Sequence, residues 1–436
     1  MPLASVVSPK MLLGVGTALH FLVDALCACC LYELAVGGGV AGVAAVIVLY
    51  NVLAFLTQPL TGMLADRLRE PRLLLALSVV LLSLGVAVAS VVASGFMASL
   101  QRVGLLVVAV LLGLGNSLFH VWGGKRVAVV TGNDMRALGV FVSTGALGLA
   151  VGLLFHSWLL LFGLLLLTGL LAGLVMIGRC GADRQRAIAP HRCWGLLLLV
   201  LMAVVLLRSL VGQTFTVSLS HVGIGALVVG LVSMLGKMWG GWLARWLGVV
   251  WSMVLVVAGV VACLLAVHAG AVVLLAGLLL VNMTMAVTLW LANVVLPGRE
   301  GLAFGLLAAA LMPGYLLAQF AGEGFSVLPS LLLTLVPTIV IELCVLWALR
   351  ERRPDVLWSS VVVNVLTNVP LNLYITYVDG SIAAMVAGEV LVLVVEALWY
   401  AYFVRRWQQA FVYSFLCNGI SCVAGVLVML LLTLFR

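Results

Sequence analysis

The hexapeptide Gly62-Met-Leu-Ala-Asp66-Arg67 ends an apolar stretch, and a similar hexapeptide, Gly241-Trp-Leu-Ala-Arg245-Trp246, ends another in the second half of the chain. Each closes the second in a series of apolar stretches that are long enough to cross a membrane as helices, which takes about 20 residues. The longest polar gap, 179–192 with the sequence RCGADRQRAIAPHR, lies between them. This pattern predicts two related sets of six membrane-spanning helices joined by a polar linker.

The composition supports the same class. Of the 436 residues, 65% are hydrophobic and 8% are charged, whereas a soluble globular protein has about 25% charged residues. We therefore expect a polytopic protein surrounded by the lipid bilayer. The apolar run 11–36 is too long for a signal-peptide core and lacks a small-residue cleavage pattern, so the first helix is predicted to remain. The net charge of +8 comes from basic residues between spans, and no nucleic-acid partner is expected.

The apolar pattern predicts an all-α polytopic membrane protein with about fifteen transmembrane helices. The predicted spans are 11–36, 39–65, 73–94, 103–131, 136–155, 158–178, 195–219, 222–244, 249–268, 270–296, 302–323, 328–350, 356–378, 382–404 and 411–435. The predicted domains are an N-terminal six-helix half (1–178), a cytoplasmic linker (179–194), a C-terminal six-helix half (195–353) and a three-helix C-terminal extension (354–436).

The distribution of basic residues predicts the orientation. If the N-terminus is cytoplasmic, nearly all the arginines and lysines between spans fall on the inner side, and only Arg102 and Arg436 fall outside. Cytoplasmic loops are enriched in lysine and arginine. We therefore expect a cytoplasmic N-terminus, an external C-terminus and a location in the plasma (inner) membrane.

Three segments carry a family resemblance. Gly62–Arg72 and Gly236–Gly248 resemble the two copies of the signature of the major facilitator superfamily, in which a glycine precedes an Asp-Arg pair and a basic cluster. A third segment, from Gly115-Asn-Ser-Leu-Phe119-His120 through Lys125-Arg126 to the glycine-rich helix with Gly145, Gly148 and Gly152, is similar to the fosmidomycin-resistance-like exporters of that superfamily. The three helices after Arg353 are additional to the family plan.

The resemblance implies two six-helix halves around a cavity that opens to alternate sides of the membrane. It also implies that Gly62, Asp66 and Arg67 belong to a cytoplasmic gate, in which the aspartate accepts hydrogen bonds from the end of a neighbouring helix. Arg136, in the next cytoplasmic loop, is the expected partner of Asp66. The alternative is that these charges only set the topology.

His20 and Asp24 place ionisable groups inside the first predicted span, four residues apart on one helix face. Such groups are costly in a membrane and usually face a cavity or a partner. We interpret them as a proton-titrating pair that lines the cavity, and the alternative is a structural pair within one helix. Arg208, deep in the seventh span, needs an acid, and Asp24 or Glu342 is the expected partner. Arg208 would then either bind an anionic substrate or form a permanent ion pair.

A transition metal is a weaker alternative for the same face. Cys27 lies one turn beyond Asp24, and imidazole, carboxylate and thiolate ligands together suit such ions. However, Cys29 and Cys30 cannot face the same ion on one helix. Cysteine is also a common packing residue in buried helices, so no resident metal is expected.

Polar residues recur in the three C-terminal spans. Asn364, Asn368 and Asn372 are spaced by four residues, and Glu389 and Glu396 share a face of the next helix. An antiparallel hairpin would bring Asn364 to the depth of Glu396 and Asn372 to the depth of Glu389. We interpret this as a polar ladder that holds two helices together in lipid, and the alternative is a second proton path.

The function favoured by these features is secondary active transport, with proton-coupled export of a small organic solute or drug. The alternatives are uptake of a transition metal or organic anion, and a transport-inactive scaffold or sensor that binds a protein partner, or itself, through the last three helices. The sequence has no Gly-Lys-Ser/Thr phosphate-binding loop and no His-Glu-x-x-His, Gly-x-Ser-x-Gly or paired Cys-x-x-Cys motif. Neither ATP hydrolysis, nor catalysis, nor a cofactor is therefore expected.

Overall fold

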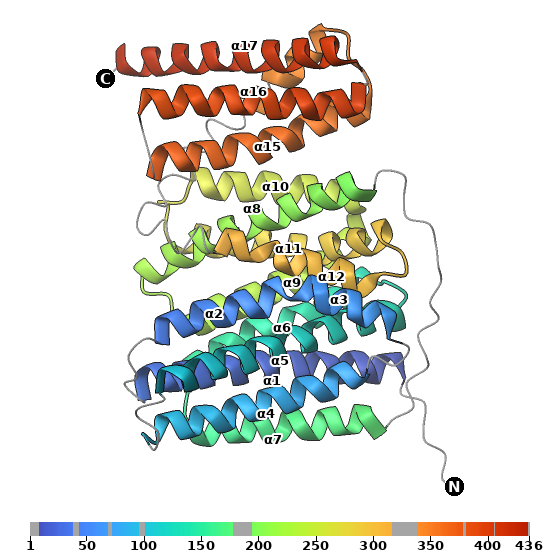
Figure 1. Ribbon diagram of the computed structural model, residues 1–436, viewed down its shortest axis with the longest axis vertical. Coiled ribbons are helices and arrows are strands. Elements are labelled where there is room, and N and C mark those ends of the chain that lie inside the picture. The colour runs from blue at the N-terminus through green and yellow to red at the C-terminus, as the bar shows by residue number, and fades with distance from the viewer. Residues whose placement is uncertain are drawn as a thin grey trace. The chain divides into compact units, whose positions relative to one another are not determined.

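The structure is a computed structural model of the 436-residue chain, shown in Figure 1. It describes residues 8–37, 43–68, 72–95, 101–177, 194–315, 338–339, 341–377, 381–404 and 406–434. The chain divides into two compact units, Met1–Ala318 and Gln319–Arg436, which are treated separately below as the large unit and the C-terminal unit. The predicted linker 179–194 lies almost entirely outside the described residues.

The described part of the large unit is helical throughout. Its elements are α1 (Pro9–Tyr32), the π-helix η1 (Glu33–Gly37), α2 (Val43–Leu56), α3 (Gln58–Arg67), α4 (Arg72–Ala93), α5 (Gln101–Val130), α6 (Met135–Leu154), α7 (Trp158–Ile177), α8 (Trp194–His221), α9 (Ala226–Leu247), α10 (Val249–Leu265), α11 (Ala271–Val295) and α12 (Glu300–Ala309). We call α1–α7 the first helix set and α8–α12 the second helix set.

The C-terminal unit is also helical where it is described. It contains a helix over 341–348, followed by α15 (Pro354–Tyr377), α16 (Ile382–Val404) and α17 (Trp407–Leu434). α15 packs against α16, and α16 packs against α17. Most of the connection between α15 and α16 lies outside the described residues.

The helices have the length and composition of membrane spans. Among the described residues, ten helices are long and apolar enough to cross a membrane, and two shorter helices are also apolar. Many large hydrophobic side chains are exposed on the helix surfaces, such as Leu159 at 86% and Leu166 at 66%. In water these surfaces would be unfavourable, so the structure confirms an all-α polytopic membrane protein.

The second predicted span is broken. Instead of one helix over 39–65, α2 ends at Leu56 and α3 begins at Gln58, with Pro59 in its first turn. Proline has no N–H to continue the helical ladder, and the Thr57 hydroxyl donates to the carbonyl of Leu53 at 2.6 Å. The break places Gln58 at the cavity described below.

Glycines allow the central helices to approach closely. A Cβ atom on Gly148 of α6 would lie 2.3 Å from the Phe21 carbonyl oxygen of α1, and one on Gly152 would lie 2.3 Å from that of Ala25. Similarly, a Cβ atom on Gly241 of α9 would lie 2.4 Å from the Met135 carbonyl oxygen of α6. Small residues are the usual means of close helix packing in lipid, and here they join α1, α6 and α9.

Candidate functional site

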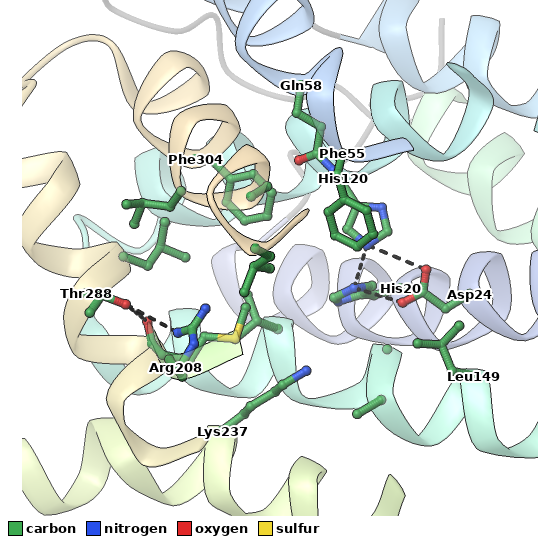
Figure 2. A pocket seen from close by; sticks show the side chains of 18 residues that line it. His20, Asp24, Phe55, Gln58, His120, Leu149, Arg208, Lys237, Thr288 and Phe304 are labelled. Carbon is green, nitrogen blue, oxygen red and sulfur yellow. Dashed lines mark hydrogen bonds and ion pairs between the residues drawn. The ribbon is translucent and has the colours of Figure 1, made fainter. Parts of the chain in front are cut away.

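A cavity of about 130 Å³ lies between the two helix sets of the large unit, and Figure 2 shows the residues around it. Its wall is mostly apolar, with five ionisable side chains. The ionisable residues are His20 and Asp24 from α1, His120 from α5, Arg208 from α8 and Lys237 from α9. A mainly apolar cavity with a few converging polar groups is the usual form of a small-molecule site.

A second cavity of about 180 Å³ adjoins the first. Both are lined by Arg208, Lys237, Ala146, Met285 and Leu311. The second is also lined by polar residues such as Gln213 and Asn282. Arg208 and Lys237 therefore lie where the two spaces meet.

His20, Asp24 and His120 form a compact triad on the wall of the first helix set (Figure 2). Nε2 of His20 lies 2.9 Å from Nε2 of His120 and 3.4 Å from Oδ2 of Asp24. Nε2 of His120 lies 3.5 Å from Oδ1 of Asp24. The Asn116 side chain donates to the same carboxylate oxygen at 3.1 Å. The predicted His20–Asp24 pair is therefore present, with His120 as a third member.

Two backbone carbonyls assign the protons of the histidines. Nδ1 of His20 lies 2.7 Å from the Phe141 oxygen, and Nδ1 of His120 lies 3.0 Å from the Asn116 oxygen. A carbonyl oxygen only accepts, so both Nδ1 atoms carry a proton. The short contact between the two Nε2 atoms then needs a further proton, which makes one ring an imidazolium beside Asp24. The triad is thus built to hold one extra proton.

A glycine leaves room for the triad. A Cβ atom on Gly145 of α6 would lie 2.3 Å from Oδ2 of Asp24 and 2.6 Å from Nε2 of His20. Alanine at this position would displace one of the two side chains. Gly145 therefore fixes the distance between α6 and the triad.

Arg208 and Lys237 form a basic pair on the opposite side of the cavity (Figure 2). Arg208 is 9% exposed, and its guanidinium donates to the Thr288 hydroxyl at 3.5 Å. Lys237 is half-buried in the middle of α9. Within the described residues, no carboxylate forms an ion pair with either side chain. Buried cations without an acid are costly, so a bound anion would stabilise them.

One predicted partner of Arg208 was wrong. Asp24 lines the same cavity but interacts with the two histidines and Asn116. Glu342, the other predicted partner, belongs to the C-terminal unit, where it accepts a hydrogen bond from Asn364, and its pairing with Arg208 stays a prediction. The arginine lies on the opposite wall from Asp24, and for that reason it bonds a hydroxyl instead.

The only cluster of metal-type ligands found among the described residues is His20, Asp24 and His120, whose ligand atoms all lie within 4.8 Å of one another. Cys27 does not belong to it, contrary to the predicted set, because its sulfur faces the Asn116 amide at 3.9 Å. Two imidazoles and a carboxylate suit a transition metal. However, each ring's Nδ1 already bonds a carbonyl, and the two Nε2 atoms lie at hydrogen-bond distance from each other, which favours a proton.

Asp66 holds the beginning of α12. Its carboxylate accepts the backbone N–H groups of Gly301 at 2.9 Å and Leu302 at 2.8 Å, and Nζ of Lys125 lies 3.5 Å away. An anion at a helix N-terminus is stabilised by the free N–H groups and the helix dipole. Gly62, one turn earlier on α3, has no room for a Cβ atom, which would lie 2.3 Å from the Gly301 oxygen.

The other two predicted gate residues take different positions. Arg136 does not pair with Asp66. Its guanidinium binds Asp134 at 2.7 Å and lies over the Trp242 ring of α9 at 5.2 Å. The reason is local, since Asp134 caps α6 two residues before Arg136. The side-chain hydrogen bond from Arg136 also lowers the pKa of Asp134. Arg67 is exposed at the end of α3.

Asn364, Glu342 and Glu396 of the C-terminal unit are buried, whereas Asn368, Asn372 and Glu389 are half-buried. Asn364 donates to Glu342 rather than to Glu396, so this predicted pair was wrong. Glu396 accepts from Thr367 and Asn418. Asn368 donates to the Asn364 side chain, and Asn372 donates to the Asn368 carbonyl. The pairing of Asn372 with Glu389 stays a prediction. The side chains that bind Glu342 and Glu396 therefore lie on α15 and α17.

Two site residues escaped the sequence prediction. His120 was named only as part of the segment that is similar to exporters, yet it completes the triad. Lys237 was read only as part of the segment Gly236–Gly248. The available signal was its position, since Lys237 is an ionisable residue ten residues before the end of α9. Such residues inside spans usually face a cavity.

The comparisons with known proteins concern the fold. No protein-family model matches the chain, and no curated protein matches it. Among solved structures, the chain is similar to a variant of the E. coli fucose:proton symporter FucP, with a TM-score of 0.54 and 14% identity over 73% of this chain and 92% of that one. It is also similar to FucP described as a major facilitator superfamily transporter in the outward conformation, with a TM-score of 0.51 and 15% identity over 71% and 91%. The chain therefore has the fold of these transporters.

Proposed function

We propose that this protein is a proton-coupled secondary active transporter of a small organic anion that works by alternating access. The observation that carries this proposal is the cavity between the helix sets, where Arg208 and Lys237 face the His20–Asp24–His120 triad. The fold shared with major facilitator transporters supports the transport class. The similarity of the Phe119-His120 segment to exporters supports export from the cell.

The basic pair supports an anionic substrate. Arg208 and Lys237 line both adjoining cavities, and an arginine fork together with a lysine ammonium can bind a carboxylate or phosphate by charge-assisted hydrogen bonds. The apolar wall, which includes Phe55, Phe304 and Met285, suits the hydrocarbon part of such a molecule. A small carboxylate with an apolar body fits these features.

The triad supports the proton coupling. Loss of the proton between His20 and His120 leaves two lone pairs facing each other at 2.9 Å. The rings then have to separate, which moves α5 against α1. Proton release is thereby linked to a rearrangement of the helices around the substrate, as coupling requires.

The test uses purified full-length protein in liposomes with an imposed pH gradient. A panel of small carboxylates and phosphate esters is screened for proton movement that depends on the solute, with Asp24→Asn as the variant. We expect at least one anion to move protons through the wild type and not through the variant. If no anion moves protons while a protein co-purifies stably, the scaffold alternative replaces this proposal.

A transition metal as the transported ion is a second candidate, because of the triad's ligand geometry. The two readings differ in one measurement, the uptake of zinc or manganese by the same liposomes. Metal uptake that is lost in His120→Gln and unaffected in Lys237→Ala would favour the metal. Anion transport that is lost in Lys237→Ala favours the first proposal.

A further inference from the structure

The C-terminal unit contains an internal repeat. Two segments carry a glutamate, a serine eighteen positions later and an asparagine four positions after that serine. The two sets are Glu342, Ser360, Asn364 and Glu396, Ser414, Asn418. Each set spans one helix, a turn that contains an arginine (Arg352 or Arg406) and the helix that follows. The unit is therefore built from two related helix hairpins.

Both hairpins make the same contacts. Nδ2 of Asn364 donates to Oε2 of Glu342 at 2.5 Å and to the carbonyl of the serine one turn earlier at 3.1 Å. Nδ2 of Asn418 donates to Oε2 of Glu396 at 2.5 Å and to the corresponding serine carbonyl at 3.0 Å. Both hydrogens of each amide are thus used. The residues that repeat in the sequence therefore make the same hydrogen bonds in both hairpins.

The two glutamates lie close together. Asn364 on α15 binds Glu342, and Thr367, one turn further, donates to Oε1 of Glu396 at 3.1 Å. On α17, the Cys417 thiol donates to the Glu342 carbonyl, and its neighbour Asn418 binds Glu396. Both glutamates are 0% exposed. The two glutamates are therefore buried near one another, between α15 and α17.

No cationic side chain of the described residues contacts either glutamate. Their side-chain partners are two amides and a hydroxyl, all of them neutral donors. Arg352, in the turn after this helix, is ten residues beyond Glu342. At the rise of an α-helix, this separation corresponds to about 15 Å along the helix axis. Two neighbouring carboxylates in a medium of low dielectric cannot both stay charged. At least one positive charge must accompany the pair.

The structure leaves a place for that charge. In the described part of the C-terminal unit, three buried side-chain oxygen atoms make no hydrogen bond, namely Oε1 of Glu342, Oγ of Ser360 and the hydroxyl of Tyr400. Tyr400 lies one turn after Glu396 on α16, with its hydroxyl near Ser360 and Glu342. In the second hairpin the corresponding atoms are filled, since Glu396 accepts from Thr367 and Ser414 donates to the Leu393 carbonyl. Among the described residues, the glutamate and serine of the first hairpin therefore keep open oxygen atoms, and those of the second hairpin do not.

We propose that Glu342 and Glu396 form a binding site for one exchangeable monovalent cation, a proton or Na⁺, with Ser360 and Tyr400 completing the site. Carboxylate and hydroxyl oxygens are the ligands that hard cations prefer. The other titratable groups that face the pair are Tyr400, Cys417 of α17 and Glu389, two turns before Glu396 on α16. The residues of this site all belong to the C-terminal unit, and its test does not require transport.

The experiment uses the full-length protein in nanodiscs. Its thermal unfolding is measured in sodium chloride and in choline chloride at equal ionic strength, and its infrared spectrum is recorded for the band of a protonated carboxyl group. The variants are Glu342→Gln and Glu396→Gln, and Glu300→Gln, at the first residue of α12 in the large unit, is the control. Bound Na⁺ raises the unfolding temperature of the wild type and the control, and this rise is lost in both site variants. A bound proton gives a carboxyl band that is lost in both site variants and kept in the control.

A result with neither a sodium effect nor a carboxyl band that depends on Glu342 and Glu396 overturns the proposal. If a glutamine variant does not fold, Tyr400→Phe removes one ligand oxygen and leaves both carboxylates in place. The sodium effect should then be weakened, or the carboxyl band shifted. An unchanged sodium response and an unchanged band in Tyr400→Phe also contradict the site.

Discussion

At the scale of single residues, the protein places ionisable side chains in apolar helices, and each has a specific neighbourhood. The triad on α1 and α5 brings two imidazole rings and a carboxylate together, while the basic pair on α8 and α9 has no acid within the described residues. These two groups face one cavity. Their separation keeps the positive charge of Arg208 and Lys237 available for a bound anion.

Lys237 should contribute directly to anion affinity. Lys237→Ala is expected to weaken binding of the anion found in the liposome screen by about 10–100-fold, since a hydrogen bond to a charged group is worth about 1.5–3 kcal/mol. Lys237→Arg should retain most of the affinity. Arg245→Ala is the matched control, because Arg245 is exposed on the same helix. Equal loss of affinity in Lys237→Ala and Arg245→Ala, measured by calorimetry, would contradict a local role.

Glu351 should make stability depend on pH. Hydrogen bonds from Arg353 lower the pKa of Glu351 from 4.5 to about 2. A lowered folded-state pKa stabilises the protein above pH 4.5, and the contribution is lost as the pH falls toward 2. Because the Arg353 side chain is 46% exposed, screening leaves about 1 kcal/mol. Glu351→Gln should cost this amount at neutral pH in chemical unfolding.

The difference between Glu351→Gln and the wild type should shrink as the pH falls from 4.5 toward 2, since the Glu351 carboxyl then takes up a proton in the unfolded chain before it does so in the folded protein. The double variant with Arg353→Gln should cost little more than the single variant, because both changes remove the same interaction. A stability difference that stays constant with pH would mean that this ion pair does not contribute.

At the scale of helices, the two helix sets are joined where glycines let the backbone of one helix approach the backbone of another. α3 meets α12 at Gly62 and Gly301, and α6 meets α9 at Gly139 and Gly241. Asp66 fastens the first contact by binding the N-terminal amides of α12. These contacts lie at the end of the large unit where α3 and α9 finish and where α6 and α12 begin. Opening at this end must break the Asp66 hydrogen bonds.

Asp66→Ala should therefore loosen α12. The amides of Gly301 and Leu302 are expected to exchange hydrogen for deuterium about ten times faster, since each lost hydrogen bond is worth about 1–2 kcal/mol. Gly62→Ala should act in the same direction, because the added methyl group pushes the helices apart. Gly14→Ala is the control, with no atom within 4 Å of its added carbon. Unchanged exchange in the peptide 300–309 would show that Asp66 does not hold this contact.

At the scale of the whole molecule, the chain combines a large unit with the central cavity and a C-terminal unit with its own buried polar centre. Among the described residues, the side chains that bind Glu342 and Glu396 belong to the C-terminal unit. Each unit thus contains a buried ionisable site of its own. Substitutions can therefore be directed at either site.

The orientation of the chain can be tested by fusions. The distribution of arginine and lysine predicts a cytoplasmic N-terminus and an external C-terminus. Alkaline phosphatase fused after Arg436 should therefore be active, and green fluorescent protein at the same position should be dark in a bacterial host. The same fluorescent protein before Met1 is the control and should be bright. The opposite pattern at the C-terminus would mean an even number of spans.

The class of fold, and several ionisable residues that lie inside membrane spans, could be predicted from the sequence alone. Apolar stretches of membrane length predict helices, because the bilayer leaves few alternatives to a helix. Asp24, Arg208 and Glu342 were recognisable from the cost of an ionisable group in such a stretch. The break between α2 and α3 was readable in principle from Pro59.

Which side chains pair with one another follows from the packing of the helices and could not be read from the sequence. His120 joins His20, Arg136 turns to Asp134, and Asn364 binds Glu342 instead of Glu396. These partners lie on helices that are distant in sequence, and a contact between them depends on the rotation and register of each helix. Hydropathy defines the length of a span but not its rotation, so the composition of the sites was decided by helix packing.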